Sequence, residues 1–263
     1  MALNSSCWTK TIIKIDSMGN EFCYVPKVQF IDGEGSDRRT LKIEAAFYIA
    51  KYTVTKKDFL RFLDDTGYEY SEYELLDMLA PTPDSPVTPV SWYDAKQYVR
   101  WLRHLTQEYY SLPNEEEWEV AARGEKGNYY PWGNSPDPNS ELPVFSVDDE
   151  QKYPEPVGSK PAGDSPFGCS QMAGNVWEWT LEDVDDIGNE HILCGGSSLN
   201  GPEFCTCLSK LVGRPKKQRV PCAGFRLIYL PDELYAQYRI EAMSEEAVKS
   251  YVAYGDTSTV HVK

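Results

Sequence analysis

A carboxylate set between two tryptophans is the first candidate for chemistry in the chain. Glu178 lies between Trp177 and Trp179 and follows the pair Gly174-Asn175. Gly and Asn tolerate left-handed backbone angles, so we expect a sharp turn there, followed by a segment whose side chains alternate between two faces. Carbonyls of such a turn, together with a carboxylate, are the oxygen ligands that calcium prefers. The residues point to a calcium cage or to a packing motif built on aromatic rings.

Two cysteines, Cys205 and Cys207, are the second candidate. They could bind a metal or form a redox pair, but one intervening residue is a poor chelate spacing for zinc. We therefore interpret them as buried or partly buried free thiols, with the metal or redox pair as the alternative. The three histidines, His104, His191 and His261, are spread over a helix, a loop and the terminal tail, which argues against a histidine-bound metal.

Further short blocks of aromatic, glycine and capping residues occur in a fixed order around these candidates. They are Pro89–Ala95, Leu112–Glu119, Pro131–Asn134, Gly195–Ser197 and Gly224–Arg226. Together with the tryptophan stretch, they resemble the formylglycine-generating enzyme (sulfatase-modifying factor) family over roughly residues 20 to 230. The resemblance implies a single α+β domain of C-type-lectin-like fold with extensive irregular loops.

The resemblance also implies a catalytic position. In that family two cysteines separated by four residues follow Gly-Gly-Ser, bind copper(I) and oxidise a substrate cysteine to formylglycine. Here Asn200 occupies the first position and Cys205 the second, with Cys207 as the alternative because the loop differs in length. Asn is not a copper(I) ligand, and no pair of cysteines in the chain has the family spacing. Copper is therefore not expected, and neither is the family's iron chemistry, which uses a histidine triad.

By the same resemblance, calcium would be held by the side chain of Gln171, the backbone oxygens of Gly174 and Val176, and Glu178. Family members mostly carry Asn or Asp at the first of these positions. Gln is neutral and longer, so weaker binding or an empty site is expected. The alternative is that Glu178 hydrogen-bonds the neighbouring turn without an ion.

Three capping patterns predict the helices that position these residues. Each pairs a Ser, Thr or Asn with an acidic residue three positions later, followed by apolar residues at helical spacing: Thr55 with Asp58, Ser91 with Asp94, and Asn114 with Glu117. An alternating apolar pattern predicts a strand over 41–51. Within 21–30, the run Phe22-Cys-Tyr-Val-Pro26 resembles the opening strand of the family. Residues 128–167, rich in Pro, Gly, Asn and Asp, are expected to be irregular, and 198–223 a long loop without a hairpin.

The chain divides into an N-terminal arm or edge strand (1–20), the domain (21–230) and a C-terminal extension (231–263). In the extension, Ser244 could cap a helix that presents Ala247, Val248, Tyr251 and Val252 on one face. That helix either folds back on the domain or docks a partner.

Composition narrows the functional classes. The net charge of −15 and a pI near 4.7 argue against binding to nucleic acid or to anionic membranes. The sequence has no apolar run of membrane-spanning length and no signal-peptide pattern at its start. Seven cysteines without repeated spacing do not indicate a secreted disulfide framework, so a cytoplasmic location is expected.

Five basic residues stand out in this acidic chain: Lys210, Arg214, Lys216, Lys217 and Arg219. They lie in the segment that the resemblance assigns to the substrate-facing surface. Such a run is usually a solvated face, but on a binding surface it would attract an acidic partner.

The sequence therefore predicts a catalytically degenerate member of the family. It would act as a protein-binding or regulatory subunit in a bacterial regulatory or defence system, through residues 198–223 and the C-terminal tail. The alternative is a copper-dependent oxidase with a site rearranged around Cys205 and Cys207. A retroelement-type ligand-binding receptor is a weaker alternative.

Overall fold

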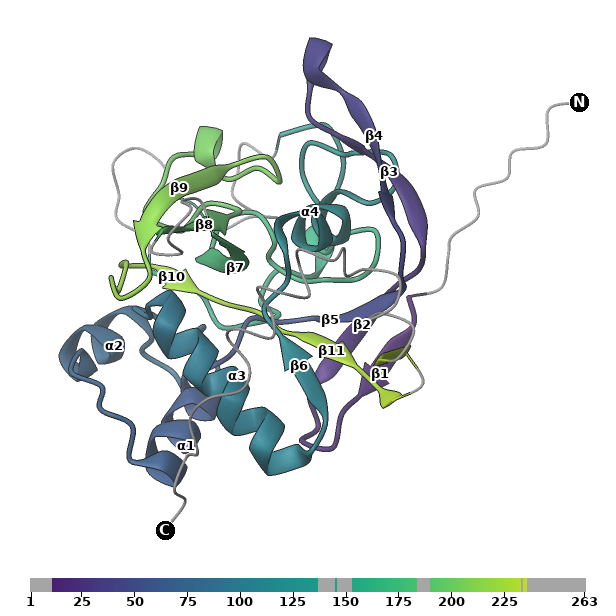
Figure 1. The fold of residues 1–263 in the computed structure, drawn as a ribbon. Helices are drawn as coiled ribbons and strands as arrows, with labels where there is room; N and C mark the ends of the chain where they lie inside the picture. The colour runs from purple at the N-terminus through teal and green to yellow at the C-terminus, as the bar shows by residue number, and fades with distance from the viewer. Residues whose placement is uncertain (1–10, 137–144, 146–152, 184–189, 233, 236–263) are drawn as a thin grey trace, which may run out of the picture.

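A computed structural model describes residues 11–136, 145, 153–183, 190–232 and 234–235 of the chain. Its elements form a five-stranded sheet covered by helices, a smaller four-stranded sheet beside it, and a projecting two-stranded hairpin (Figure 1). The predicted α+β single-domain architecture is confirmed. No helix in the described ranges is long and apolar enough to cross a membrane.

The five-stranded sheet is antiparallel throughout and runs in the order β1-β2-β5-β11-β6. Its strands are β1 (Ile13–Ile15), β2 (Glu21–Val25), β5 (Phe47–Ala50), β11 (Ile228–Leu230) and β6 (Tyr109–Ser111). Residues 13–15 of the predicted arm thus form an edge strand. The last strand of the domain, β11, lies in the interior of the sheet, so the sheet is completed by chain from both ends of the domain.

Both faces of this sheet are buried, because successive side chains along a strand point to opposite faces. Phe22 and Tyr229 pack in the cluster formed with helices α1 (Lys56–Thr66) and α3 (Trp92–Thr106). Their neighbours Cys23 and Ile228 pack in a second cluster with helix α4 (Glu115–Arg123). The sheet is therefore the middle layer between two apolar cores.

The three helix starts predicted from capping pairs are confirmed. Two of them are complete capping boxes: Asn114 Oδ1 accepts from the Glu117 amide at 2.7 Å, and the Glu117 carboxylate accepts from the Asn114 amide at 2.8 Å. Ser91 and Asp94 make the same exchange at α3, and Thr55 caps α1. Helix α2 (Tyr73–Leu79) was not predicted, because it is short and has no side-chain cap.

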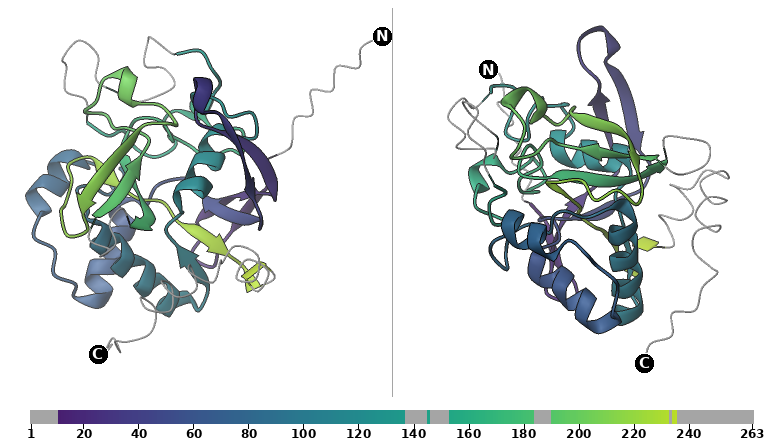
Figure 2. Two further views of the ribbon diagram at one scale, coloured as in Figure 1. Left: turned by 45° about the horizontal axis from the view of Figure 1, so that its top comes forward. Right: turned by 90° about the vertical axis from the view of Figure 1, so that its left-hand side faces the viewer.

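Two predictions about strands were wrong. Residues 41–51 do not form one strand: β4 (Arg39–Ile43) ends at Ile43 and β5 begins at Phe47. The division follows from their partners, since β4 pairs with β3 (Val28–Asp32) in the projecting hairpin whereas β5 pairs with β2 (Figures 1 and 2). Residues 198–223 are not a loop throughout either, because they contain β9 (Lys210–Pro215), which pairs antiparallel with the earlier strand β8 (Glu190–Cys194).

The four-stranded sheet runs β10-β7-β8-β9 and carries the tryptophan stretch on β7 (Trp177–Asp183). Strand β10 (Ala223–Gly224) pairs parallel with β7 and leads directly towards β11 of the larger sheet. The described parts of 128–167 are irregular, as expected: they hold turns, one isolated bridge between Tyr130 and Gly133, and one short 3-10 helix. The predicted helix from Ser244 lies outside the described residues, as does most of the C-terminal extension.

Asp94 connects helix α3 to the turn that follows β9. It is almost completely buried, and besides closing the capping box with Ser91 it accepts a hydrogen bond from the Tyr68 hydroxyl at 2.8 Å. Arg219 donates to it through two nitrogens, at 2.8 and 2.9 Å. One carboxylate therefore holds three segments that are distant in the sequence.

We predict that Asp94→Asn destabilises the protein by about 2 kcal/mol, because it removes the charge facing a partly buried guanidinium and one of the acceptor oxygens. The matched control is Asp64→Asn, an exposed carboxylate on α1, which should change stability by no more than about 0.5 kcal/mol. Urea unfolding followed by circular dichroism measures both variants. Equal midpoints for Asp94→Asn and the unchanged protein would contradict this role.

Candidate functional site

A buried ion pair between Glu178 on β7 and Arg226, just before β11, lies where three of the sequence blocks meet. Both side chains are excluded from solvent. Arg226 Nε donates to Glu178 Oε2 at 2.6 Å and Nη2 donates to Oε1 at 2.7 Å, which makes the contact bidentate. The indole of Trp118 on α4 donates to the same Oε2 at 2.8 Å. Three of the sequence blocks therefore meet at one carboxylate.

The guanidinium of Arg226 has no donor left over. Nη1 donates to the carbonyls of Ala50 and Lys51, at 2.9 and 3.1 Å, and Nη2 also donates to the Ser170 carbonyl at 3.0 Å. Burial opposes its charge, but the facing Glu178 carboxylate outweighs this and raises the pKa of Arg226 above its ordinary value. The arrangement is a structural junction with its charge balanced and its hydrogen bonds satisfied.

The residues assigned to calcium do not form a suitable cage. Glu178 is the one carboxylate among them, and Arg226 neutralises it. The Gln171 side chain is turned to another segment: its oxygen accepts from the Gly158 amide at 3.0 Å, and its nitrogen donates to the Pro156 carbonyl and to Ser159 Oγ. A divalent cation beside a guanidinium, with no unbalanced negative charge, binds weakly.

Two further observations concern this stretch. The Asn175 side chain bonds both backbone groups of Glu155, at 2.8 and 3.1 Å, so it fixes a neighbouring loop. Glu178 does not hydrogen-bond the Gly174-Asn175 turn, which had been the alternative to calcium; it bonds Arg226 and Trp118. In the described part of the chain, no three His, Cys, Asp or Glu side chains gather as metal ligands.

In the turn after Gly195-Gly196, Asn200 and Cys205 both hydrogen-bond to Ser197. The Asn200 side-chain oxygen accepts from the Ser197 hydroxyl at 2.7 Å and from its amide at 3.2 Å. Cys205 Sγ donates to the Ser197 carbonyl at 3.5 Å. Gly196 permits this fold-back, because its φ is +80° and a Cβ there would lie 2.1 Å from the Phe204 carbonyl oxygen. Asn200 thus closes this turn through its bonds to Ser197.

Neither cysteine of this segment is set up for thiolate chemistry. Cys205 is 1% exposed, and burial raises its pKa to about 12. Cys207 packs in the core with Trp118, and burial raises its pKa as well. Both are free thiols, as interpreted from the sequence, and both are protonated at neutral pH. The two described histidines lie in different places: His104 is exposed on α3, and His191 stacks on Trp92. His261 lies outside the described residues.

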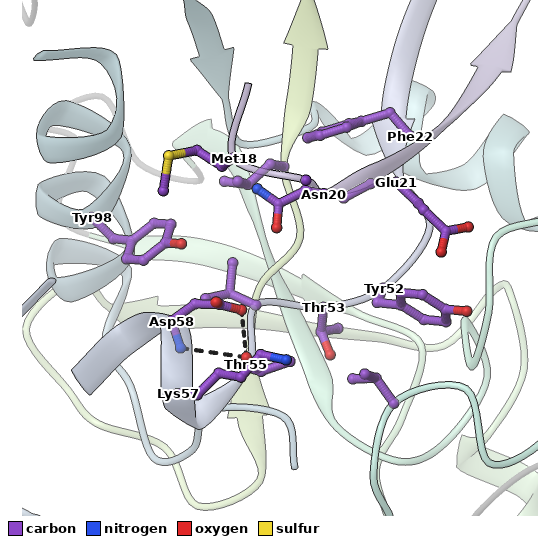
Figure 3. A pocket seen from close by; sticks show the side chains of 15 residues that line it. Met18, Asn20, Glu21, Phe22, Tyr52, Thr53, Thr55, Lys57, Asp58 and Tyr98 are labelled. Atoms are coloured by element: carbon purple, nitrogen blue, oxygen red, sulfur yellow. Dashed lines mark hydrogen bonds between the residues drawn. The ribbon is translucent and has the colours of Figure 1, made fainter. Parts of the chain in front are cut away.

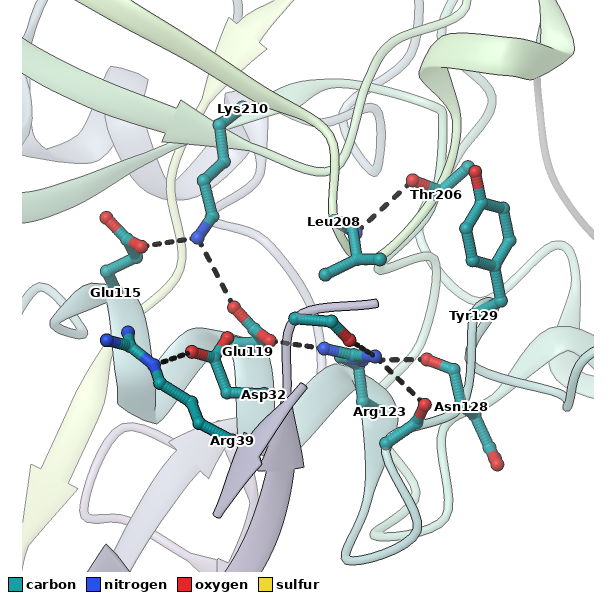
Figure 4. Close-up of polar contacts among 12 residues, drawn as sticks. Asp32, Arg39, Glu115, Glu119, Arg123, Asn128, Tyr129, Thr206, Leu208 and Lys210 are labelled. Carbon is teal, nitrogen blue, oxygen red and sulfur yellow. Dashed lines mark hydrogen bonds and ion pairs between the residues drawn. The ribbon is translucent and has the colours of Figure 1, made fainter. Parts of the chain in front are cut away.

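The predicted basic cluster does not form one exposed patch. Lys210 pairs with Glu115 and, at 3.3 Å, with Glu119, which also binds Arg123 (Figure 4). Arg219 pairs with Asp94, as described above. Arg214 and Lys216 are half-buried, and Lys217 is exposed. Two of the five cations therefore stabilise the fold, which the sequence could not show because their acidic partners lie about a hundred positions earlier.

Aromatic residues with no role predicted from the sequence border the cysteine turn. Tyr130 and Trp132 stack with ring centres 4.9 Å apart, and both are half-buried. Burial, then Tyr129 and the nearby thiols of Cys205 and Cys207, raise the pKa of Tyr130. Phe204, in the turn itself, is 51% exposed. The Pro131–Asn134 block was the available signal for this aromatic surface.

We predict that Glu178→Gln destabilises the protein by about 3–5 kcal/mol, because it leaves the Arg226 charge buried without its partner. Glu44→Gln, which removes one partner of an exposed pair with Lys42, is the control and should cost less than about 1 kcal/mol. Guanidinium unfolding measures both. A Glu178→Gln protein as stable as the control would show that the ion pair does not hold the sheets together.

A melting experiment can test whether calcium binds at Gln171, Gly174, Val176 and Glu178. Because the carboxylate is neutralised, we expect the same melting temperature in millimolar calcium and in excess chelator. A ligand at 100 times its dissociation constant would stabilise by roughly 2.7 kcal/mol, which is readily detected. A chelator-sensitive melting temperature that becomes insensitive in Gln171→Ala would establish the calcium site instead.

Comparison with known proteins places these features in a family. Residues 17–230 match the family described as the sulfatase-modifying factor enzyme 1-like domain. The chain is 30% identical over 185 residues to the formylglycine-generating enzyme of Mycobacterium tuberculosis, covering 58% of this chain and 60% of that protein. It is 37% identical over 121 residues to inactive C-alpha-formylglycine-generating enzyme 2 of Mus musculus, covering 43% of this chain and 37% of that protein.

The chain thus spans less than two thirds of the length of either relative. Among solved structures, PvdO from Pseudomonas aeruginosa has the same fold, with a TM-score of 0.71 at 20% identity over 84% of this chain and 99% of that one. The ordered blocks, the junction at Glu178 and the match over most of the chain lead to one conclusion: the chain belongs to the sulfatase-modifying factor enzyme 1-like domain family.

Proposed function

We propose that this domain is catalytically degenerate and works as a protein-binding or regulatory subunit. The observation that carries the proposal is the turn at Ser197. There the Asn200 carboxamide takes the place of a thiol, and Cys205 is buried and protonated. A copper(I) site needs facing thiolates, and these residues supply none at neutral pH. The existence of an inactive relative, the mouse formylglycine-generating enzyme 2, is consistent with loss of the reaction in this family.

The surface around the turn supports a binding role. Phe204 presents an exposed ring and the Tyr130–Trp132 stack lies half-buried in the same region. Partly exposed aromatic residues are enriched at the centres of protein interfaces, where they supply contact area at low entropic cost. Lys217 adds an exposed positive charge within 198–223. We therefore propose that a segment of another protein, with acidic residues at its edge, binds here; a contribution of the C-terminal tail is part of the same proposal.

The alternative function, oxidation of a substrate cysteine, draws on the 30% identity to the M. tuberculosis enzyme. It requires Cys205 or Cys207 to become a thiolate, and burial opposes this at both positions. The six cysteines in the described residues are all free. That observation supports a reducing compartment, and we propose the cytoplasm.

We predict that a photo-crosslinking amino acid at position 204 captures one partner protein in cells of the native host. The matched control is position 78 on α2, where Met78 is 49% exposed and Phe204 is 51%. With the captured partner purified, Phe204→Ala should weaken its binding by roughly tenfold or more, because truncation of an interface anchor costs at least about 1.4 kcal/mol. Adducts of equal yield at both positions, or none at 204, would refute a binding surface at this turn.

A second experiment distinguishes the proposed protein-binding function from oxidation of a substrate cysteine. The protein is incubated with copper(I), oxygen and a cysteine-containing peptide of the sulfatase type, and the peptide is followed by mass spectrometry. We expect no aldehyde product. Asn200→Cys should raise the affinity for copper(I), because it restores a second thiol beside Cys205. An aldehyde formed by the unchanged protein and lost in Cys205→Ala would establish the oxidase instead.

A further inference from the structure

A pocket of about 290 Å³ lies between β2, the segment from Tyr52 to Thr55 and the start of helix α1 (Figure 3). None of the residues of the Ser197 turn lines it, so it is distinct from the site described above. Its volume exceeds that of cavities known to hold benzene and approaches the range of small-molecule sites. Its apolar walls include Met18, Phe22, Val54 and Leu227.

One polar group in this pocket has no hydrogen-bond partner among the residues that the structure describes. Tyr98 on α3 is 3% exposed, and its hydroxyl points into the cavity (Figure 3). In the described part of the chain, no group makes a hydrogen bond to that hydroxyl. The hydroxyl therefore faces the pocket, where water or a bound molecule can complete its hydrogen bonding.

The other polar groups of the pocket are mainly acceptors. The Asn20 amide nitrogen donates to Asp16 at 2.9 Å, which leaves the Asn20 side-chain oxygen directed into the cavity. Asp58 accepts from the Thr55 hydroxyl with Oδ2, so Oδ1 remains available. The cation among the lining residues, Lys57, is paired with Asp84 at 2.8 Å. The pocket therefore offers a negative charge and a neutral acceptor beside one another.

The charge pattern decides the kind of ligand. Burial, and then the charges of Asp58 and Asp16, raise the pKa of Tyr98 well above its ordinary value, so its phenol stays neutral. An anion would face the Asp58 carboxylate, whereas an ammonium group supplies the N–H donors that the oxygens of Asp58, Asn20 and Tyr98 can accept. The rings of Tyr98 and Phe22 also favour a cation at their faces.

We propose that this pocket binds a small organic ammonium ion, a primary amine with an apolar body. The ammonium group would lie between Asp58, Asn20 and the Tyr98 hydroxyl, and the body would pack on Met18, Phe22 and Leu227. This inference is independent of the proposed protein-binding function, because it concerns a different set of residues. The domain would then have a small-molecule site that is separate from the proposed protein-binding surface at the Ser197 turn.

The test compares three probes of one shape and different charge: 2-phenylethylamine, 2-phenylethanol and phenylacetate. Calorimetric titration at neutral pH should show the amine binding at least tenfold more tightly than the alcohol, and no binding of phenylacetate. Tyr98→Phe removes only the hydroxyl and should weaken amine binding severalfold. Asp58→Asn should remove the preference for the amine over the alcohol, whereas Asp64→Asn, an exposed change on the same helix, should leave it intact.

Near-ultraviolet circular dichroism verifies that each variant is folded, and Met18→Trp, which fills the cavity, should abolish binding of all probes. Equal affinities for amine and alcohol would overturn the ammonium assignment. No binding of any probe to the unchanged, folded protein would overturn the proposal as a whole. An amine affinity that is unchanged in both Tyr98→Phe and Met18→Trp would place the amine outside this pocket and would also overturn the proposal.

Discussion

The buried pair of Arg226 and Glu178 is the interaction on which the rest of the structure depends. Removing two charges from water is costly, and the cost is offset only when both groups are fully hydrogen-bonded. Here Arg226 donates to the carbonyls of Ala50 and Ser170, and Glu178 accepts from the Trp118 indole. The same contacts join the two sheets and helix α4. The blocks Gly224–Arg226 and Trp177–Trp179 depend on each other, because Arg226 in the first and Glu178 in the second neutralise each other's buried charge.

Local signals predicted the local structure well. The starts of α1, α3 and α4 were predictable because a cap and its partner lie three residues apart, and their hydrogen bonds form within one turn. The division between β4 and β5, and the pairing of β9 with β8, were not predictable in this way. Strand boundaries depend on which distant segment supplies the hydrogen bonds, and a single apolar pattern does not name that partner.

The candidate sites show the same limit. The spacing after Gly195-Gly196 was enough to place Asn200 and Cys205 in one turn, because a short loop keeps them close. The run of basic residues was misleading, since Lys210 and Arg219 are bound by Glu119 and Asp94 from far earlier in the chain. The Tyr98 hydroxyl, which has no hydrogen-bond partner in the described ranges, could not be recognised from the sequence, because the spacing of Tyr98 on α3 is that of an ordinary core residue.

The interior position of β11 has a consequence for biosynthesis. Arg226 donates to the carbonyl of Ala50, a residue 176 positions earlier, and β11 pairs with both β5 and β6. While the ribosome is still translating the middle of the domain, β11 has not been made. The edge of β5 that pairs with β11 is then open, and both apolar cores lack the side chains that β11 contributes. Contacts of such long sequence separation form late and slowly. The nascent chain must therefore be shielded from proteases and from other chains until nearly the whole domain has emerged.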